Sequence, residues 1–271
     1  MANPERSGDA KPQDPNFRKK GSLAAEHEIA ALTADDQFCN ASDRAKHPAA
    51  FFIQEKSMIF KVIAGITAGL LTQPAAKALA AKLLKARGKE LNMSKTEKYL
   101  LLGAAAVCGA FTGWTCGFTA ESLYLLALLV ISQTVAVCDI QERIIPNETV
   151  LAILALTLLF GIPSALGAKG FPDFNLWHSL IGLGACFLIF TLPALFKKNV
   201  GAGDVKLAAA MGFALGIGNS LFAIVVMGLM IIAVMFMQRQ MPALEYLKRM
   251  VPMGPFLAAA MMAVLIYVKV V

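Results

Sequence analysis

The chain has 271 residues, 57% of them hydrophobic, and a mean hydropathy of +0.62. This composition is too apolar for an ordinary water-soluble domain, and several apolar runs approach the roughly 20 residues that a helix needs to cross a bilayer. The formal net charge is +7, but no basic patch is interleaved with aromatic residues, so a nucleic-acid-binding protein is not favoured. The sequence predicts an all-α, multi-pass membrane protein.

Residues 1–57 are rich in Pro, Asp, Lys, Ala and Ser and lack hydrophobic periodicity. This pattern predicts a polar, mostly disordered tail, followed by a membrane-embedded domain over residues 58–271. No apolar h-region follows Met1, so no cleavable signal peptide is expected. Acidic and basic residues nearly balance in the tail, and the excess of positive charge therefore lies in the membrane domain.

About eight apolar segments follow the tail, each a candidate transmembrane helix. They lie near Ile59–Ala76, Tyr99–Thr115, Phe118–Cys138, Thr149–Leu166, Leu176–Phe196, Val205–Gly218, Ser220–Met237 and Met253–Val268. The first segment contains Lys61 and ends near Pro74, and the sixth is shorter than a full crossing. Gly212 and Gly216 in the sixth form a small-xxx-small pattern, which lets neighbouring helices approach closely.

Basic residues indicate how these segments are oriented in the membrane. The stretch Lys77–Lys98 is strongly basic, as cytoplasmic loops are. If the later segments alternate, most other basic residues also fall on the cytoplasmic side, namely Arg143, Lys197, Lys198, Lys206, Arg239, Lys248 and Arg249. Lys61, Lys169 and Lys269 remain outside. This topology places Asp139 and Asp204 on one cytoplasmic face, while the side on which the tail lies stays open.

The two aspartates stand in short motifs. Asp204 lies in Gly201-Ala202-Gly203-Asp204-Val205-Lys206-Leu207, and Asp139 shortly precedes the turn Ile145-Pro146-Asn147. An ionisable residue at the mouth of an apolar membrane helix indicates a functional site. Two carboxyl groups that meet share a proton, and such a pair hydrolyses a peptide bond by general acid–base catalysis. In this hypothesis Asp204, which opens a helix, is more often the ionised base.

Other interpretations of these residues stay open at this point. Asp204 and Asn147 also fit a purely structural role, in which each caps the N-terminus of a helix. The alternative function is an ion- or proton-coupled transporter whose aspartates bind the ion, although such carboxylates usually lie near the bilayer midplane. No metal site is expected, because the three histidines are scattered and the five cysteines form no Cys-x-x-Cys pair.

Taken together, the motifs resemble the type IV prepilin peptidase family of membrane aspartic proteases. Residues 201–207 match that family's G-x-G-D-x-K-L signature at every fixed position, and Asp139 with its Ile-Pro-Asn turn is similar to the family's first catalytic motif. Residues 252–256 are similar to its Pro-x-Gly-Pro-Phe segment. The resemblance covers roughly residues 99–268. Presenilin-type proteases are less compatible, because they carry Tyr where Cys138 precedes Asp139.

The resemblance implies an aspartic endopeptidase that uses Asp139 and Asp204 as its catalytic pair and needs no metal or cofactor. Five motif residues would position that pair, namely Gly201, Gly203, Lys206, Pro146 and Asn147. The implied substrates are prepilin or pseudopilin precursors, from which a short basic leader is removed at the cytoplasmic face of the inner membrane. Glu142 or Glu148 is the predicted reader of the leader's basic residues. The substrate's identity and the oligomeric state stay open.

Many bacterial members of this family also methylate the new N-terminus with S-adenosylmethionine. Those members carry two Cys-x-x-Cys pairs in the first cytoplasmic loop, whereas the stretch 77–98 of this chain has no cysteine. The resemblance therefore implies a compact member that lacks the methyltransferase activity.

Overall fold

The regular structure of the computed structural model is α-helical throughout the residues that it describes, 48–117, 119–195, 201–237 and 252–270. Its helices are α2 (Pro48–Lys85), α3 (Lys95–Thr115), α4 (Ala120–Glu142), α5 (Asn147–Ala165), α6 (Leu176–Leu195), α7 (Ala202–Met237) and α9 (Gly254–Val270). The chain divides into two units between Ser57 and Met58. Both aspartates lie in the second unit.

Part of the predicted topology lies outside the described residues. This is true of residues 1–47 of the tail and of five basic residues, Lys197, Lys198, Arg239, Lys248 and Arg249. Residues 48–57, which the sequence assigned to the tail, form the beginning of α2.

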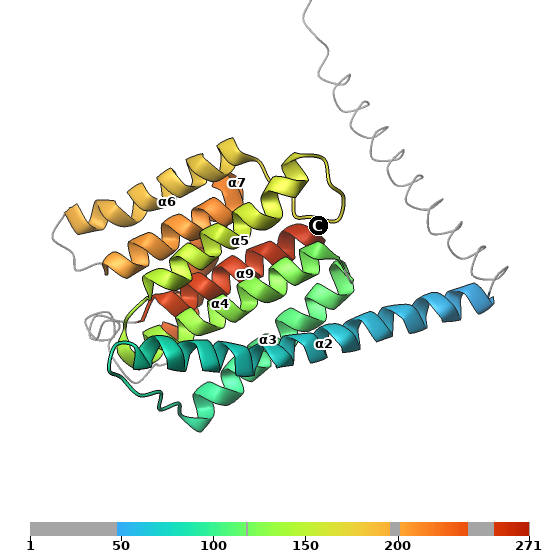
Figure 1. The fold of residues 1–271 in the computed structure, drawn as a ribbon, viewed down its shortest axis with the longest axis horizontal. Helices are drawn as coiled ribbons and strands as arrows, with labels where there is room; N and C mark the ends of the chain where they lie inside the picture. Colours follow the sequence, from blue (N-terminus) through green and yellow to red (C-terminus); the bar gives the residue numbers. More distant parts are fainter. Residues whose placement is uncertain (1–47, 118, 196–200, 238–251, 271) are drawn as a thin grey trace, which may run out of the picture. The chain divides into compact units, whose positions relative to one another are not determined.

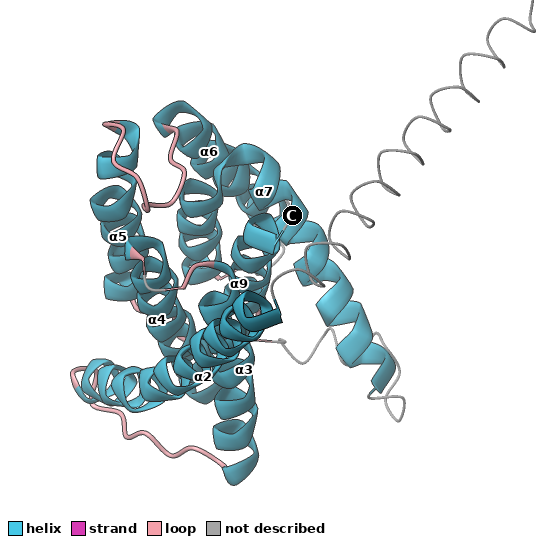
Figure 2. Ribbon diagram, turned by 90° about the vertical axis from the view of Figure 1, so that its right-hand side faces the viewer, coloured by secondary structure: helices cyan, strands magenta, loops and turns pink. Residues whose placement is uncertain are grey.

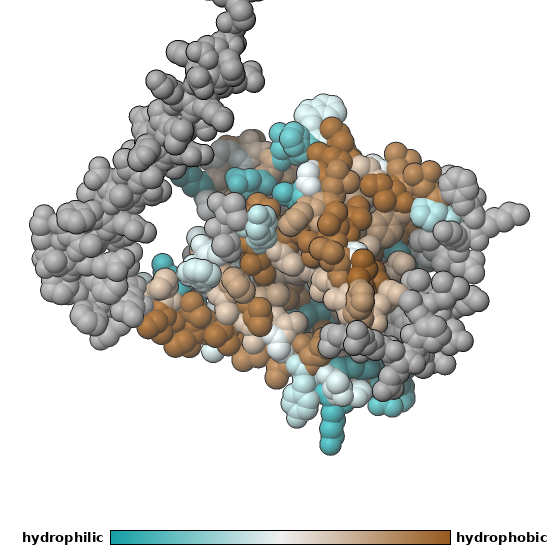
Figure 3. Space-filling view, turned by 180° about the vertical axis from the view of Figure 1, so that it is seen from behind, coloured by the Kyte–Doolittle hydropathy of each residue, from teal (hydrophilic) through white to brown (hydrophobic). Residues whose placement is uncertain are grey.

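Among the residues that the structure describes, five helices are long and apolar enough to cross a membrane. They are Ser57–Lys85 within α2, then α4, α5, Leu176–Pro193 within α6, and Ala202–Phe236 within α7. A shorter apolar helix follows at Gly254–Lys269. Hydrophobic side chains cover much of the face drawn in Figure 3, as lipid-facing helices require. The predicted all-α membrane fold is confirmed, whereas the predicted number of eight spans is not.

Two predicted helix boundaries were wrong. The first apolar helix does not end near Pro74 but continues to Lys85, so that Lys77, Lys82 and Lys85 are helical. Proline is tolerated inside a membrane helix because neighbouring groups can satisfy the backbone acceptor that it frees. The sixth and seventh predicted segments are two helices within α7, but they meet at Gly216, whose backbone is not helical (φ 72°, ψ 176°), and not between Gly218 and Ser220. Glycine adopts such a positive φ without steric cost.

The centre of the membrane unit is built by α4, α5, α7 and α9. Figure 1 shows α4 and α9 running side by side, with α5 and α7 against them, and with α6 beyond α7. The largest fully buried side chains at their contacts include Leu128, Val135, Ile153, Met211 and Met261. α3 packs against both α4 and α9. Because these helices share one core, the ends of α4, α7 and α9 are fixed relative to one another.

Glycines allow two pairs of helices to touch backbone to backbone. In α2 and α3, Gly65 and Gly69 meet Gly109 and Gly113 so closely that a Cβ atom on any of them would collide with backbone atoms. Gly212 of α7 is in the same situation against Gly182 of α6. The close approach that the small-xxx-small pattern predicts at Gly212 is therefore confirmed.

Candidate functional site

Asp139 lies in the last turn of α4, where its side chain is only 5% exposed. Its Oδ2 atom accepts a hydrogen bond of 2.8 Å from the backbone N–H of Gly254, the first residue of α9. Free N–H groups and the helix dipole make a helix N-terminus a favourable partner for a carboxylate. The segment similar to Pro-x-Gly-Pro-Phe thus holds the first aspartate.

Position 254 has no room for a side chain. A Cβ atom there would lie 2.8 Å from Asp139 Oδ2 and 3.0 Å from Asp139 Cβ, which is closer than real Cβ atoms pack against such neighbours. The absence of a side chain is what lets the Gly254 N–H reach the carboxylate. The motif at residues 252–256 contains this glycine but does not reveal its role, because the contact joins residues far apart in the chain.

Asp204 lies in the first turn of α7, which begins at Ala202. Its own N–H donates to the Gly201 carbonyl at 3.0 Å, so Asp204 is inside the helix and does not cap it. Its Oδ1 atom is buried and has no hydrogen-bond partner among the described residues. Burial and, after it, the neighbouring Asp139 carboxyl both disfavour a charge on this group. The two aspartates therefore come together, as the sequence motifs predicted.

The glycines beside Asp204 leave room for the two motifs to meet. A Cβ atom on Gly203 would lie 3.0 Å from Cβ of Ile145, so the backbone before Asp204 packs directly on the Ile-Pro-Asn turn. A Cβ atom on Gly201 would lie 2.8 Å from Asp204 Oδ2. Both glycines are needed for close approach, one to a neighbouring turn and the other to the carboxylate.

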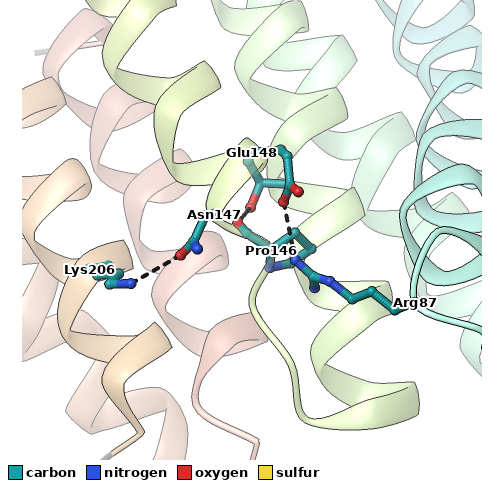
Figure 4. Close-up of polar contacts among 6 residues, drawn as sticks. Arg87, Pro146, Asn147, Glu148 and Lys206 are labelled. Carbon is teal, nitrogen blue, oxygen red and sulfur yellow. Dashed lines mark hydrogen bonds and ion pairs between the residues drawn. The ribbon is translucent and has the colours of Figure 1, made fainter.

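A hydrogen bond completes the link between the motifs. Lys206 Nζ donates to Asn147 Oδ1 at 3.1 Å, as Figure 4 shows. Asn147 is the first residue of α5, and Pro146 occupies the cap position before it, where the Pro146 carbonyl accepts a bond of 2.7 Å from the Thr149 hydroxyl. Asn147 therefore does not cap α5 as the structural interpretation supposed, and its side chain binds Lys206 instead.

The turn between α4 and α5 has an unusual backbone. Arg143 ends α4 in the left-handed region (φ 54°, ψ 38°), and it is the one non-glycine residue with positive φ among those described. Its N–H donates to the Asp139 carbonyl at 2.9 Å. Strained backbone of this kind tends to gather at functional sites. Here it redirects the chain immediately after Asp139 toward Asn147.

The two glutamates predicted to read a leader are already paired. Glu148 accepts a hydrogen bond of 3.2 Å from Arg87, an ion pair visible in Figure 4. Glu142 forms an ion pair with Lys89. Both cations belong to the connection between α2 and α3. Glu142 and Glu148 thus lie close in sequence to Asp139 and Asn147, and each is bound to a basic residue of the same chain.

Metal ligation has little support in the part of the chain that the structure describes. No three or more His, Cys, Asp or Glu side chains gather there as ligands of a metal ion would.

These features define a class of protein: a helical membrane protein in which a buried and a half-buried aspartate from different helices meet beside a glycine-rich helix start. Residues 123–237, which contain both aspartates, match the model of the type IV leader peptidase family. The family resemblance of the two motifs is therefore confirmed over this segment.

A curated relative supports the same family. The prepilin leader peptidase/N-methyltransferase of Bacillus subtilis (strain 168) is 34% identical over 98 residues, which are 35% of this chain and 35% of the relative. The match therefore spans about a third of the length of that relative. No solved structure matches the chain.

Proposed function

We propose that this protein is an aspartic endopeptidase of the inner membrane that removes a short basic leader from prepilin-like or pseudopilin precursors at the cytoplasmic face. The observation that carries the proposal is the convergence of Asp139 and Asp204 from two helices, with no cation bound to either carboxylate among the described residues. The matched family and the name of the curated relative support the choice of substrate.

Hydrogen bonding indicates which aspartate is the ionised base and which carries the proton. Asp139 accepts the N–H of Gly254, and such a bond stabilises the ionised form of a carboxyl group. Asp204 has a buried oxygen without a partner in the described structure, and a charge is costly to bury without one. We therefore assign the ionised base to Asp139 and the proton to Asp204, the reverse of the hypothesis drawn from the sequence.

The reaction follows from this assignment. Asp139 takes a proton from a water molecule, whose oxygen attacks the carbonyl carbon of the scissile peptide bond, while Asp204 gives its proton to the carbonyl oxygen. The resulting tetrahedral diol then breaks its C–N bond. Asp139 returns the proton to the leaving nitrogen, and one diol hydroxyl returns a proton to Asp204. Both aspartates end in the protonation states in which they began.

Glu142 and Glu148 remain the proposed readers of the leader. Because Lys89 and Arg87 occupy them in the free protein, a basic leader would exchange with these two side chains. Exposed ion pairs are weak, typically about 0–1 kcal/mol each, so the exchange costs little. In the free protein, Lys89 and Arg87 therefore occupy the positions that basic residues of a leader would take.

The transporter alternative is not favoured. Asp139 lies in the last turn of α4 and Asp204 in the first turn of α7, whereas coupling carboxylates usually lie midway along broken membrane helices. The break in α7 is at Gly216, three turns beyond Asp204.

The first test is cleavage of a co-expressed prepilin-like substrate by the wild type, Asp139→Asn and Asp204→Asn. Each variant is expected to lose at least about 100-fold in activity, the usual contribution of a general acid or base. Asp173→Asn is the matched control, because Asp173 is a fully exposed acid near Lys269. The proposal is wrong if either variant, at wild-type membrane levels, still removes the leader normally.

A further inference from the structure

Two basic residues, Arg87 and Lys89, stand where α2 ends in a sharp turn. The Gly88 N–H donates to the Lys85 carbonyl at 3.0 Å, and Gly88 has a positive φ of 73°. The Lys89 N–H donates to the Leu84 carbonyl, also at 3.0 Å. Two such hydrogen bonds around a left-handed glycine are a common way for a helix to end. The end of α2 therefore fixes the backbone that carries both basic side chains.

The rest of the connection between α2 and α3 is anchored beside Asp139. Figure 2 shows this connection as a pink loop that runs from the end of α2 to the start of α3. Its Met93 is 9% exposed and belongs to a buried cluster with Cys138, which directly precedes Asp139 on α4. At the start of α3, Glu97 accepts a hydrogen bond of 2.9 Å from Gln141 of α4. These contacts hold the connection next to the end of α4 in addition to its ion pairs.

The ion pairs of this connection are partly open to solvent. Arg87 lies 3.2 Å from Glu148, as Figure 4 shows, and the two side chains are 30% and 60% exposed. Lys89 pairs with Glu142, and these side chains are 39% and 26% exposed. Exposed pairs of this kind are weak, and exposed side chains change rotamer on the picosecond-to-nanosecond timescale. Both cations can therefore leave the glutamates while the backbone stays in place.

A cation that is tethered beside a glutamate competes with any cation that arrives from solution. The tether holds it at an effective concentration on the order of millimolar or more. A basic leader must therefore displace Arg87 and Lys89 before it reaches Glu148 and Glu142. Cleavage separates the leader from the rest of the precursor, so that the leader loses the binding contribution of that part. The tethered cations then have the advantage over the cleaved leader.

We propose that Arg87 and Lys89 are an internal competitor of the substrate's leader, which occupies Glu148 and Glu142 in the free enzyme and displaces the cleaved leader from them. The inference rests on the proposed peptidase function and adds a step of product release to it. It also gives a role to two cations that lie where a basic leader would bind and that would otherwise only repel it.

Removal of the competitor tests the proposal. The probe is the free leader peptide of a prepilin-like precursor that the wild type cleaves, added as an inhibitor of that cleavage. In the double variant Arg87→Gln and Lys89→Gln, the Ki of this peptide should fall about three- to tenfold, because two weak ion pairs no longer oppose it. The matched control is Lys85→Gln with Lys95→Gln, which removes the same charge from exposed positions at the two ends of the connection. The control should lower the Ki by no more than about twofold.

A variant that keeps both charges separates competition from a change in the fold of the connection. Arg87→Lys with Lys89→Arg should have a Ki close to that of the wild type. An unchanged or raised Ki in the double Gln variant, or an equal fall in the control or in the charge-keeping variant, would overturn the inference while leaving the peptidase proposal intact. If the wild type cleaves no prepilin-like substrate, the proposed function itself fails.

Discussion

The two ends of α4 carry acidic residues in opposite circumstances. At its beginning, Glu121 is met by Lys269 at 2.5 Å, and the same lysine lies 3.7 Å from Asp173. At its other end, about 27 Å away along the helix, Asp139 is met by a backbone N–H and by a second acid, Asp204. One end therefore pairs opposite charges, and the other brings two carboxyl groups together.

This difference separates a structural site from a functional one. A buried acid paired with a cation offsets much of its desolvation cost, and removing either partner leaves an uncompensated charge. Two neighbouring carboxyl groups have no cation to compensate them and do not ionise together easily, so that one proton is retained and shared between them. Such an arrangement lowers the stability of a helical bundle, and it is typical of sites where the shared proton takes part in catalysis. Acidic groups with perturbed pKa values therefore gather at functional sites.

After the aspartates themselves, the largest loss of activity is expected from Gly254→Ala. Its methyl group would lie on Asp139, displacing the carboxylate from the N–H that holds it, and charge-assisted hydrogen bonds contribute about 1.5–3 kcal/mol. We expect kcat to fall about 10- to 100-fold with little change in KM. The control is Gly184→Ala, where a Cβ atom has no neighbour within 4 Å. If Gly254→Ala and Gly184→Ala have the same kcat and KM, Gly254 does not position the catalytic carboxylate.

At the opposite end, Lys269→Met should affect stability and not catalysis. It leaves Glu121 partly buried without its cation, which should cost about 1–2 kcal/mol of stability after allowing for partial exposure. Thermal unfolding in detergent measures this loss, with Lys169→Met as the exposed control. A loss of kcat in well-folded Lys269→Met would show that the two ends are not functionally distinct.

The smallest effect is expected from reversing the charges that flank the aspartates. The double variant Glu142→Lys and Glu148→Lys should raise KM for a basic leader about fivefold, because each surface pair contributes about 1 kcal/mol or less. A substrate with a neutral leader should be unaffected. Glu90→Lys is the control, since Glu90 is exposed in the same connection between α2 and α3. An unchanged KM would exclude both glutamates as leader readers.

The convergence of the aspartates was predictable, because each motif signals a helix end locally. Asp139 lies near the end of one apolar run and Asp204 at the start of another, and loop charges placed both on one face. The role of Gly254 was not predictable in the same way. Its partner is distant in sequence, and a glycine between two prolines is typical of many turns. Only the packing of α9 against α4 shows that the missing side chain makes room for a carboxylate.

The predicted helix boundaries were wrong where tertiary packing overrides local sequence preferences. Pro74 signals a helix end in a soluble protein, yet α2 passes through it. The predicted boundary between Val205–Gly218 and Ser220–Met237 lies two residues beyond the break, which is at Gly216. The ion pairs of Arg87 and Lys89 could not be predicted from the sequence either, because a basic residue in a loop does not indicate which acidic residue it contacts.

Proton sharing between Asp139 and Asp204 is tested most directly by infrared difference spectroscopy of the carboxyl stretch, on purified protein in lipid nanodiscs. In the pH range where the enzyme is active, we predict one protonated carboxyl band that disappears in Asp204→Asn, which removes the group that carries the proton, and that changes frequency in Asp139→Asn, which removes its partner. Asp173→Asn should leave the band unchanged. A band that survives in both aspartate variants, or its absence from the active wild type, would contradict the shared-proton pair.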